Sequence, residues 1–282
     1  MMEIATWATR PEDLEDLGDA SRIYLGHETC ERLLPDEDAA RALGALAFAR
    51  RVAVTLVTPG LSDRGIVRAR RLVDGLREVL DTVEVACSDW GLLCALAREG
   101  TTTLALGRHL SGQLTDPRLL RLVSPVTISG GGAKEVQHVD GTRCQLRRAE
   151  ARPSLASRVR GSALDDPAVR SFLLQNGVRR VELSHLPQGT SLPPGFSCSL
   201  HVSDLPLAVF DRCPGVSEDL VSPRACAPPR CGSEEVRWLG LEVPGRVYRR
   251  ANALWYRPSE SLGEAFPTGV DRLVLREDRS GS

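Results

Sequence analysis

Short apolar runs alternate with amphipathic segments along about the first 200 residues. The apolar runs have the length of strands and are mostly bounded by Gly, Pro, Asp or Ser, whereas the segments between them place apolar residues at helical spacing. This alternation predicts repeated β-α units and parallel strands with helical crossovers. The expected strands are Glu3 to Ala8, Arg22 to Leu25, Val52 to Val57, Val83 to Cys87, Thr102 to Leu106, Arg179 to Leu183 and Ser197 to Val202. The expected helices are Pro11 to Leu17, Asp36 to Arg50, Asp63 to Leu80, Trp90 to Arg98 and Asp166 to Asn176.

The number of expected strands exceeds that of a minimal flavodoxin-like sheet and approaches the eight strands of a TIM barrel. We therefore expect an α/β fold, an irregular TIM-barrel-like domain over residues 1–205. A cysteine-bearing segment and a C-terminal meander, residues 206–282, are expected to pack on it. Residues 124–161 break the alternation with three consecutive glycines and several arginines, and we interpret them as an excursion from the barrel.

Composition limits the partners and the location. The formal net charge of -1 gives no overall attraction to nucleic acid or to an anionic membrane surface. The arginine-rich stretch 143–160 lacks interleaved aromatic residues, so no nucleic-acid partner is expected. No apolar run approaches the roughly 20 residues that span a bilayer, and residues 1–4 lack the features of a secretory signal. The sequence predicts a cytoplasmic protein.

Eight cysteines in a reducing cytosol favour metal binding or catalysis over disulfides for those that cluster. Cys213, Cys226 and Cys231 lie close together in sequence, and Cys30 lies far upstream. Three grouped thiolates and one distant thiolate can enclose an iron–sulfur cluster, which needs several soft ligands. A structural zinc site and buried free thiols are the alternatives. The other four cysteines are expected in the core: Cys87, Cys94, Cys144 and Cys198.

Two places at strand ends carry polar candidates. Asp89 and Trp90 lie where an expected strand ends and a helix begins, on the rim where barrel enzymes build their sites. Arg108 follows another expected strand and can bind a carboxylate through two hydrogen bonds. The alternatives are a helix cap for Asp89, ordinary packing for Trp90 and an ion pair for Arg108.

Two later strands carry further candidates. Glu182 is an acidic residue on an expected barrel strand, where an inward side chain needs a partner or a function. His201 and His185 follow or end later strands and can donate protons, since imidazole titrates near neutral pH. The candidate catalytic residues are thus Asp89, Arg108, Glu182 and His201, with Trp90 and Arg108 as candidate substrate-binding residues.

Six segments follow one another in an order that is typical of a known family. They are Met2-Glu3-Ile4, Ile23-Tyr-Leu-Gly26 followed by Cys30, Ser88-Asp-Trp-Gly-Leu92, Gly107-Arg108 with Asp116-Pro-Arg118, Gly177-Val-Arg-Arg-Val-Glu-Leu183, and Leu205-Pro-Leu-Ala before Arg212-Cys213. Through these segments the whole chain resembles the collagenase-like peptidase family U32, and more closely its iron–sulfur branch that acts in oxygen-independent ubiquinone hydroxylation. The resemblance implies a [4Fe-4S] cluster on Cys30, Cys213, Cys226 and Cys231. The chain departs from the family pattern in two places. Four residues lie between Cys226 and Cys231, where three is more usual, and Ser88 stands where the family has Asn.

The resemblance implies an enzyme or enzyme subunit that hydroxylates a small aromatic or quinone-precursor-like substrate without molecular oxygen. It also implies a homologous partner subunit, because the resembling ubiquinone proteins work in pairs. Two alternatives remain: a non-catalytic redox or accessory iron–sulfur subunit, and the peptidase of the family name. No Ser-His-Asp set or HExxH helix stands in the sequence, so peptidase activity is not expected.

Overall fold

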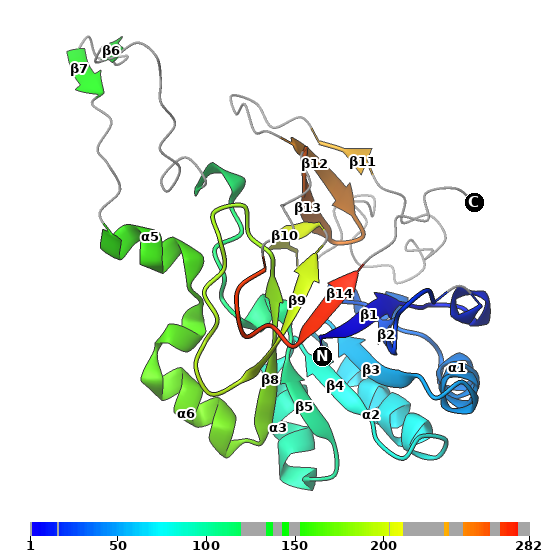
Figure 1. Ribbon diagram of the computed structural model, residues 1–282. Helices are drawn as coiled ribbons and strands as arrows, with labels where there is room; N and C mark the ends of the chain where they lie inside the picture. The colour runs from blue at the N-terminus through cyan, green and yellow to red at the C-terminus, as the bar shows by residue number, and fades with distance from the viewer. Residues whose placement is uncertain are drawn as a thin grey trace.

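The computed structural model describes residues 2–15, 17–119, 134–137, 143–146, 153–202, 204–210, 234–236, 245–259 and 266–275. Eight parallel strands form a closed barrel, in the order β1-β14-β9-β8-β5-β4-β3-β2 (Figure 1). The expected TIM-barrel-like α/β fold is confirmed. The barrel strands are β1 (Glu3–Trp7), β2 (Arg22–Gly26), β3 (Ala53–Thr58), β4 (Glu84–Cys87), β5 (Thr103–Leu106), β8 (Val178–Ser184), β9 (Ser197–Val202) and β14 (Arg272–Leu275).

Helices cover the outside of the barrel, and each long one begins at a side chain that accepts a backbone amide. Asp36, Ser62, Asp89 and Asp166 are these N-caps, and each satisfies an amide that the first helical turn leaves unpaired. The expected helix Pro11 to Leu17 is shorter in the structure, a 3-10 turn η1 over Pro11–Leu14. The outer helices are α1 (Glu37–Ala49), α2 (Asp63–Arg77), α3 (Trp90–Glu99) and α6 (Pro167–Gln175).

Two features make the barrel irregular. Strands β5 and β8 pair directly, although the excursion that holds the hairpin β6 (Lys134–Gln137) and β7 (Arg143–Leu146) and the helix α5 (Pro153–Arg160) separates them in sequence. The last barrel strand, β14, lies within the segment that the sequence analysis placed with the C-terminal meander, and it pairs with both β1 and β9. The barrel therefore takes strands from both expected parts of the chain.

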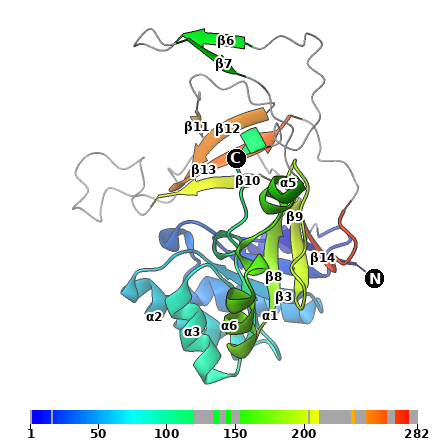
Figure 2. The same cartoon turned by 90° about the vertical axis from the view of Figure 1, so that its left-hand side faces the viewer.

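A second, antiparallel sheet lies over the end of the barrel toward which β9 and β14 point (Figures 1 and 2). Its order is β10-β13-β12-β11, so β10 forms one edge. Since the carboxyl ends of parallel strands meet at one end of a barrel, this sheet covers the usual location of a barrel active site. Its strands are β10 (Leu205–Val209), β11 (Glu234–Glu235), β12 (Gly245–Arg250) and β13 (Ala253–Pro258).

Side chains alternate between the two faces of each barrel strand, as strand geometry requires. On β8, Val181 and Leu183 face the helices and join the main apolar core, whereas Glu182 and its inward neighbours face the barrel axis. The barrel interior holds a small apolar cluster formed by Ala5, Tyr24, Val57, Ala86, Ala105 and Val274. The small alanines leave room inside the barrel for large polar side chains.

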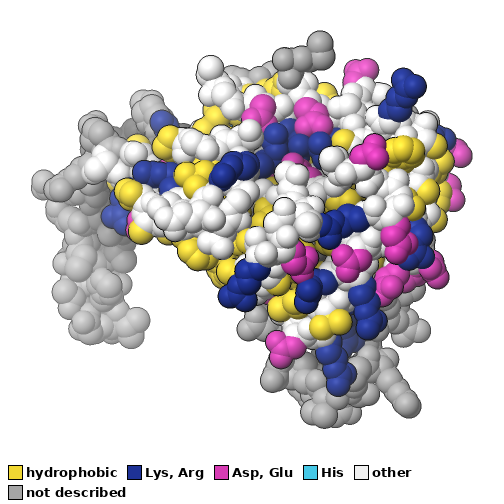
Figure 3. All heavy atoms as spheres, turned by 90° about the horizontal axis from the view of Figure 1, so that it is seen from below, with side chains coloured by type: hydrophobic (Ala, Val, Ile, Leu, Met, Phe, Trp, Pro, Cys, Tyr) yellow, Lys and Arg dark blue, Asp and Glu magenta, His cyan; other side chains and the backbone are white. Residues whose placement is uncertain are grey.

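The opposite end of the barrel shows no segregation of charge. Figure 3 views the molecule from that side, and basic and acidic side chains are interspersed over the described surface. In the part of the chain that the structure describes, no helix combines the length and the apolar character needed to cross a bilayer.

Candidate functional site

Arg108 lies at the carboxyl end of β5 and joins three parts of the barrel mouth. Its Nε and Nη2 atoms donate to the two oxygens of Glu28 at 2.8 and 2.5 Å, and its Nη1 atom donates to the Ser184 hydroxyl at 3.4 Å and to the Asp204 carbonyl at 3.2 Å. The Arg108 and Glu28 side chains are only 2% and 4% exposed. Burial alone would raise the pKa of Glu28, but the Arg108 guanidinium holds it well below its usual range. Arg108 is thus a buried ion-pair partner that ties the loop after β2 to the start of β10.

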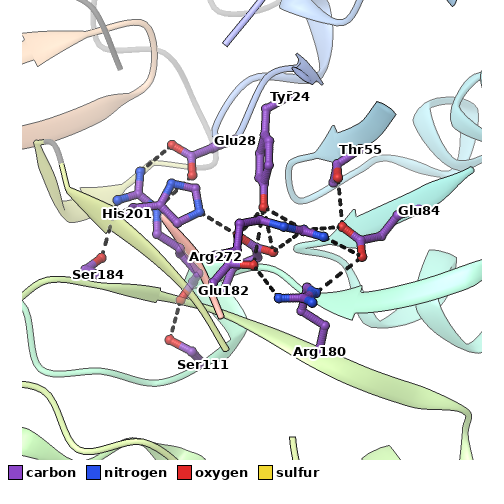
Figure 4. A network of polar contacts seen from close by, with 12 residues as sticks. Tyr24, Glu28, Thr55, Glu84, Ser111, Arg180, Glu182, Ser184, His201 and Arg272 are labelled. Carbon is purple, nitrogen blue, oxygen red and sulfur yellow. Dashed lines mark hydrogen bonds and ion pairs between the residues drawn. The ribbon is translucent and has the colours of Figure 1, made fainter. Parts of the chain in front are cut away.

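Glu182 and His201, both candidates from the sequence, are in direct contact inside the barrel (Figure 4). The Nε2 atom of His201 lies 2.7 Å from a Glu182 carboxylate oxygen, and both residues are buried. Burial, together with the nearby Arg108 charge, lowers the pKa of His201, so the ring is neutral at pH 7 and its Nε2–H donates to Glu182. The Nδ1 atom of His201 is buried and has no hydrogen-bond partner among the residues that the structure describes. His201 thus has one nitrogen without a partner there, while Glu182 orients the ring through the other nitrogen.

A charged network continues from Glu182 toward the other end of the barrel (Figure 4). The Tyr24 hydroxyl lies 3.0 Å from both Glu182 oxygens, and Arg272 donates to that hydroxyl at 3.1 Å and to Glu84 at 2.5 Å. Burial would raise the pKa of Glu84, but Arg272 and Arg22 hold it below its usual value. The ion pairs of this network join the carboxylates of Glu3, Glu84 and Glu182 to the guanidiniums of Arg22, Arg180 and Arg272.

Asp89 and Trp90 lie apart from this network. One Asp89 oxygen accepts the Leu92 amide at 2.8 Å and caps α3, and the other accepts the Leu61 amide at 3.1 Å. Trp90 is 42% exposed and packs edge-on against Phe172 of α6, with ring centroids 5.9 Å apart. The contacts of Asp89 are those of a helix cap that also fixes the preceding loop.

A pocket of about 270 Å³ opens between the loop after β5 and the edge strand β10. Its polar wall comes from Arg108, His109, Gln113 and Ser184, and residues 206–209 of β10 supply a mainly apolar wall. The Nε2 atom of His109 is buried, and no described residue forms a hydrogen bond with it. The Gln113 side-chain amide bonds both the backbone N–H and the C=O of Ser184, so this wall is held in place by hydrogen bonds. The pocket can hold a small molecule with one apolar face and one polar face.

Cys30 lies in the loop after β2, at the same end of the barrel. It is half-buried, and its backbone N–H donates to Nδ1 of His27 at 3.1 Å. Cys213, Cys226 and Cys231 lie outside the described residues, as does the side chain of Cys144. Among the described residues, no three His, Cys, Asp or Glu side chains form a group that could hold a metal ion. Cys87 and Cys198 are buried, as expected for core thiols, and Cys94 is half-buried.

Acid is expected to destabilise the protein through its buried histidines. Burial and the Arg108 charge lower the pKa of His109 from 6.5 to about 4, and burial also lowers the pKa values of His185 and His201. Between these folded values and 6.5 the unfolded chain binds more protons, so the free energy of unfolding falls as pH falls, by up to about 1.4 kcal/mol per pH unit for each group. Urea unfolding between pH 6.5 and 5 should show this slope, and H109Q should reduce it. An equal slope in H109Q would contradict the assignment.

Comparison with known proteins adds one likeness. No protein-family model matches the chain, and no curated protein matches it. A solved structure of the U32 peptidase Mk0906 aligns over 100% of this chain and 94% of that chain, with 13% sequence identity and a TM-score of 0.45. A likeness of this size concerns the fold alone and carries no argument about function.

Arg108, Glu182 and His201 were predictable from the sequence as candidate site residues, but most of their interaction partners were not. Glu28, Tyr24, Glu84 and Arg272 complete the buried contacts. The alternation within strands could have indicated two of them: Glu84 stands in Val83-Glu-Val-Ala-Cys87 and Arg272 precedes Leu273-Val-Leu275, both charged residues at inward positions of apolar strands. Nothing in the sequence indicates that Glu28 forms the ion pair with Arg108.

Proposed function

We propose that this chain is an iron–sulfur protein of the U32 family, in which Cys30, Cys213, Cys226 and Cys231 hold a [4Fe-4S] cluster beside the barrel mouth. The observation that carries the proposal is the bridge made by Arg108. It contacts Glu28, two residues before Cys30, and Asp204, at the start of the strand that leads toward Cys213. Eight residues lie between Asp204 and Cys213, and the nine residue steps that join these two positions can extend over about 30 Å. The bridge therefore supports a meeting of the two parts of the cysteine set at one end of the barrel.

The donor chemistry fits such a cluster. Four thiolates are the ligand set that a [4Fe-4S] cluster takes, and such a cluster supplies electron transfer or structural support when every iron has a cysteine ligand. His27 also fits this role, because its Nδ1 accepts the amides of both Thr29 and Cys30 and fixes the turn that presents the thiol. On the other side of Cys30, Glu31 accepts from the amide and hydroxyl of Ser62, which anchors the loop to α2.

We further propose the reaction that the family resemblance implies, an oxygen-independent hydroxylation of a small aromatic or quinone-precursor-like substrate by a cytoplasmic enzyme or enzyme subunit. The pocket beside Arg108 is where such a substrate would lie, with its ring against β10 and its polar groups toward His109 and Ser184. His201 is the proposed proton acceptor. Its Nδ1 atom has no hydrogen-bond partner among the described residues, and Glu182 orients the ring through the other nitrogen. Arg108 would hold the polar wall of the pocket in place through Glu28.

A second candidate is a non-catalytic redox or accessory subunit. The contacts of Arg108 favour it, because the guanidinium is already engaged by Glu28, Ser184 and Asp204 and is 2% exposed. In that role the polar mouth would serve to fix the covering sheet on the barrel.

The two candidates differ in the behaviour of H201N. The protein should be purified without oxygen, alone and with any homologous subunit, and incubated anaerobically with aromatic precursors and with prephenate, the hydroxyl donor that the family resemblance implies. The donor would lose its hydroxyl group and gain the hydrogen that the aromatic ring gives up, so the step needs no further oxidant, and hydroxylated product is measured by mass spectrometry. For the enzyme we expect H201N to lose product formation at least about 100-fold, the usual contribution of a proton-transfer group, with iron content and absorption spectrum unchanged. R41Q serves as control, because Arg41 forms an exposed ion pair with Glu78 and does not line the pocket. Unchanged turnover in H201N would favour the accessory role, and a wild-type protein without iron would overturn the proposal. Product formed only with the second subunit would support a heterodimer.

A further inference from the structure

Three arginine side chains surround Trp255 and Asp204 in the sheet that covers the barrel mouth. The guanidinium carbons of Arg108 and Arg250 lie 5.8 and 5.2 Å from the centre of the Trp255 ring, and Arg257 donates to Asp204. Burial would raise the pKa of Asp204, but its hydrogen bonds with Arg257 and Tyr248, together with the nearby charges of Arg257 and Arg250, hold it below its usual value. The three guanidiniums therefore lie around the same ring and carboxylate, with the Arg108 side chain buried and the Arg257 side chain 43% exposed.

Two of these arginines each bind a carboxylate through two hydrogen bonds, in the same geometry. Arg108 uses its Nε–Nη2 edge to bind both oxygens of Glu28, and Arg257 uses the same edge to bind both oxygens of Asp204, at 2.8 and 2.9 Å. Tyr248 also donates to Asp204, so both oxygens of that carboxylate already accept a hydrogen bond from a neighbour other than Arg250. This side-on geometry is the usual one for a carboxylate or phosphate on arginine.

The third arginine, Arg250, differs from the other two because its Nε–Nη2 edge binds no carboxylate of the described residues. The Nε and Nη2 atoms of Arg250 are buried, and neither has a hydrogen-bond partner in the part of the chain that the structure describes. Among the described residues, two carboxylates form ion pairs with these three guanidiniums, Glu28 with Arg108 and Asp204 with Arg257. A buried guanidinium edge without an acceptor loses the hydrogen bonds that water would make, and an uncompensated buried charge is strongly unfavourable. The Trp255 ring stabilises the face of the Arg250 cation but cannot accept its in-plane N–H groups.

We propose that the Nε–Nη2 edge of Arg250 is a binding site for an oxyanion, the carboxylate or phosphate group of a small ligand. The anion completes the pattern set by Glu28 and Asp204, and it neutralises the remaining positive charge over the barrel mouth. This site is separate from the cysteines and does not depend on the proposed cluster.

The test is anion binding to the intact, anaerobically purified chain. Sodium acetate and sodium phosphate are titrated separately at constant ionic strength, with sodium chloride as the balancing salt, and the dissociation constant and the melting temperature are measured. We expect saturable binding of at least one of the two anions, at least about tenfold weaker binding in R250Q, and an intermediate loss in R250K, which keeps the charge but not the two-point edge. R246Q is the matched control, because Arg246 lies on the same strand with an exposed side chain, and it should bind as the wild type does. The difference between acetate and phosphate identifies the anion class.

A second readout separates a ligand site from an internal ion pair. In buffer that contains chloride alone, R250Q should melt at the same temperature as the wild type or higher, because it loses an uncompensated buried charge. A clear fall in that temperature, with no effect of acetate or phosphate on the wild type, would mean that Arg250 pairs with an acid of the chain itself and would overturn the proposal. Equal anion affinity in R250Q and the wild type would also overturn it.

Discussion

Replacing Arg272 with methionine is expected to destabilise the folded chain by about 3–5 kcal/mol, the range for a buried ion pair that loses one partner. The Arg272 side chain is 2% exposed and donates to Glu3 at 2.6 Å, to Glu84 at 2.5 Å and to the Tyr24 hydroxyl. Its loss leaves two acceptor carboxylates in the barrel with fewer donors, and methionine offers none in return. Urea unfolding monitored by circular dichroism at pH 7 measures the change in the free energy of unfolding.

The matched control is R41M, since Arg41 forms a surface ion pair with Glu78 and is 41% exposed. Exposed pairs contribute about 0–1 kcal/mol, so R41M should change stability little. The double variant R272M/E84Q should recover part of the loss, because it removes a carboxylate together with its partner. If R272M fails to fold, the milder R272K, which keeps the charge, serves in the same cycle. A loss below about 1 kcal/mol in R272M would show that the network does not support the barrel.

Replacing Cys30 with alanine is expected to abolish iron and sulfide binding while leaving the barrel folded. Wild-type protein purified without oxygen should carry about four iron atoms per chain if a [4Fe-4S] cluster is present, and C30A should carry nearly none. The loop that presents Cys30 is held by His27 before it and by Glu31 after it, so the backbone there should persist without the thiol. Iron and sulfide analysis, an absorption spectrum and circular dichroism give the three readouts.

C94A is the control for C30A. Cys94 is half-buried, as Cys30 is, but it lies on α3 and belongs to the packing around the main core. C94A should therefore keep the iron content of the wild type. Equal iron in C30A and the wild type would exclude Cys30 as a ligand, and stoichiometric zinc in place of iron and sulfide would replace the cluster by a zinc site.

The barrel was predictable from the sequence because its strands and helices carry a local pattern. The strand at Val83 to Cys87 and the helix that follows Asp89 can be recognised from alternation and capping alone. The role of β14 was not predictable in this way. Four residues, Arg272–Leu275, read as one more short extended piece, and only the closed topology places them between β1 and β9.

The site could be predicted only in part, for a related reason. Glu182 and His201 were recognisable as polar residues on or near strands, and adjacent strands then brought them together. The partner of Arg108 was not recognisable, because Glu28 lies 80 residues away in a loop and their meeting depends on the closure of the barrel. Local periodicity fixes which face a side chain takes, but long-range pairing decides which charges meet.

Because β14 closes the barrel, the order of synthesis matters for this chain. Until residues 272–275 leave the ribosome, β1 and β9 each have an unpaired edge that is open to any other extended segment. The stretch from β1 to residue 275 must emerge before those edges are covered, so the growing chain is vulnerable to aggregation during that time. Cells that make this protein should therefore benefit from a chaperone that shields nascent β-structure until the ring is complete.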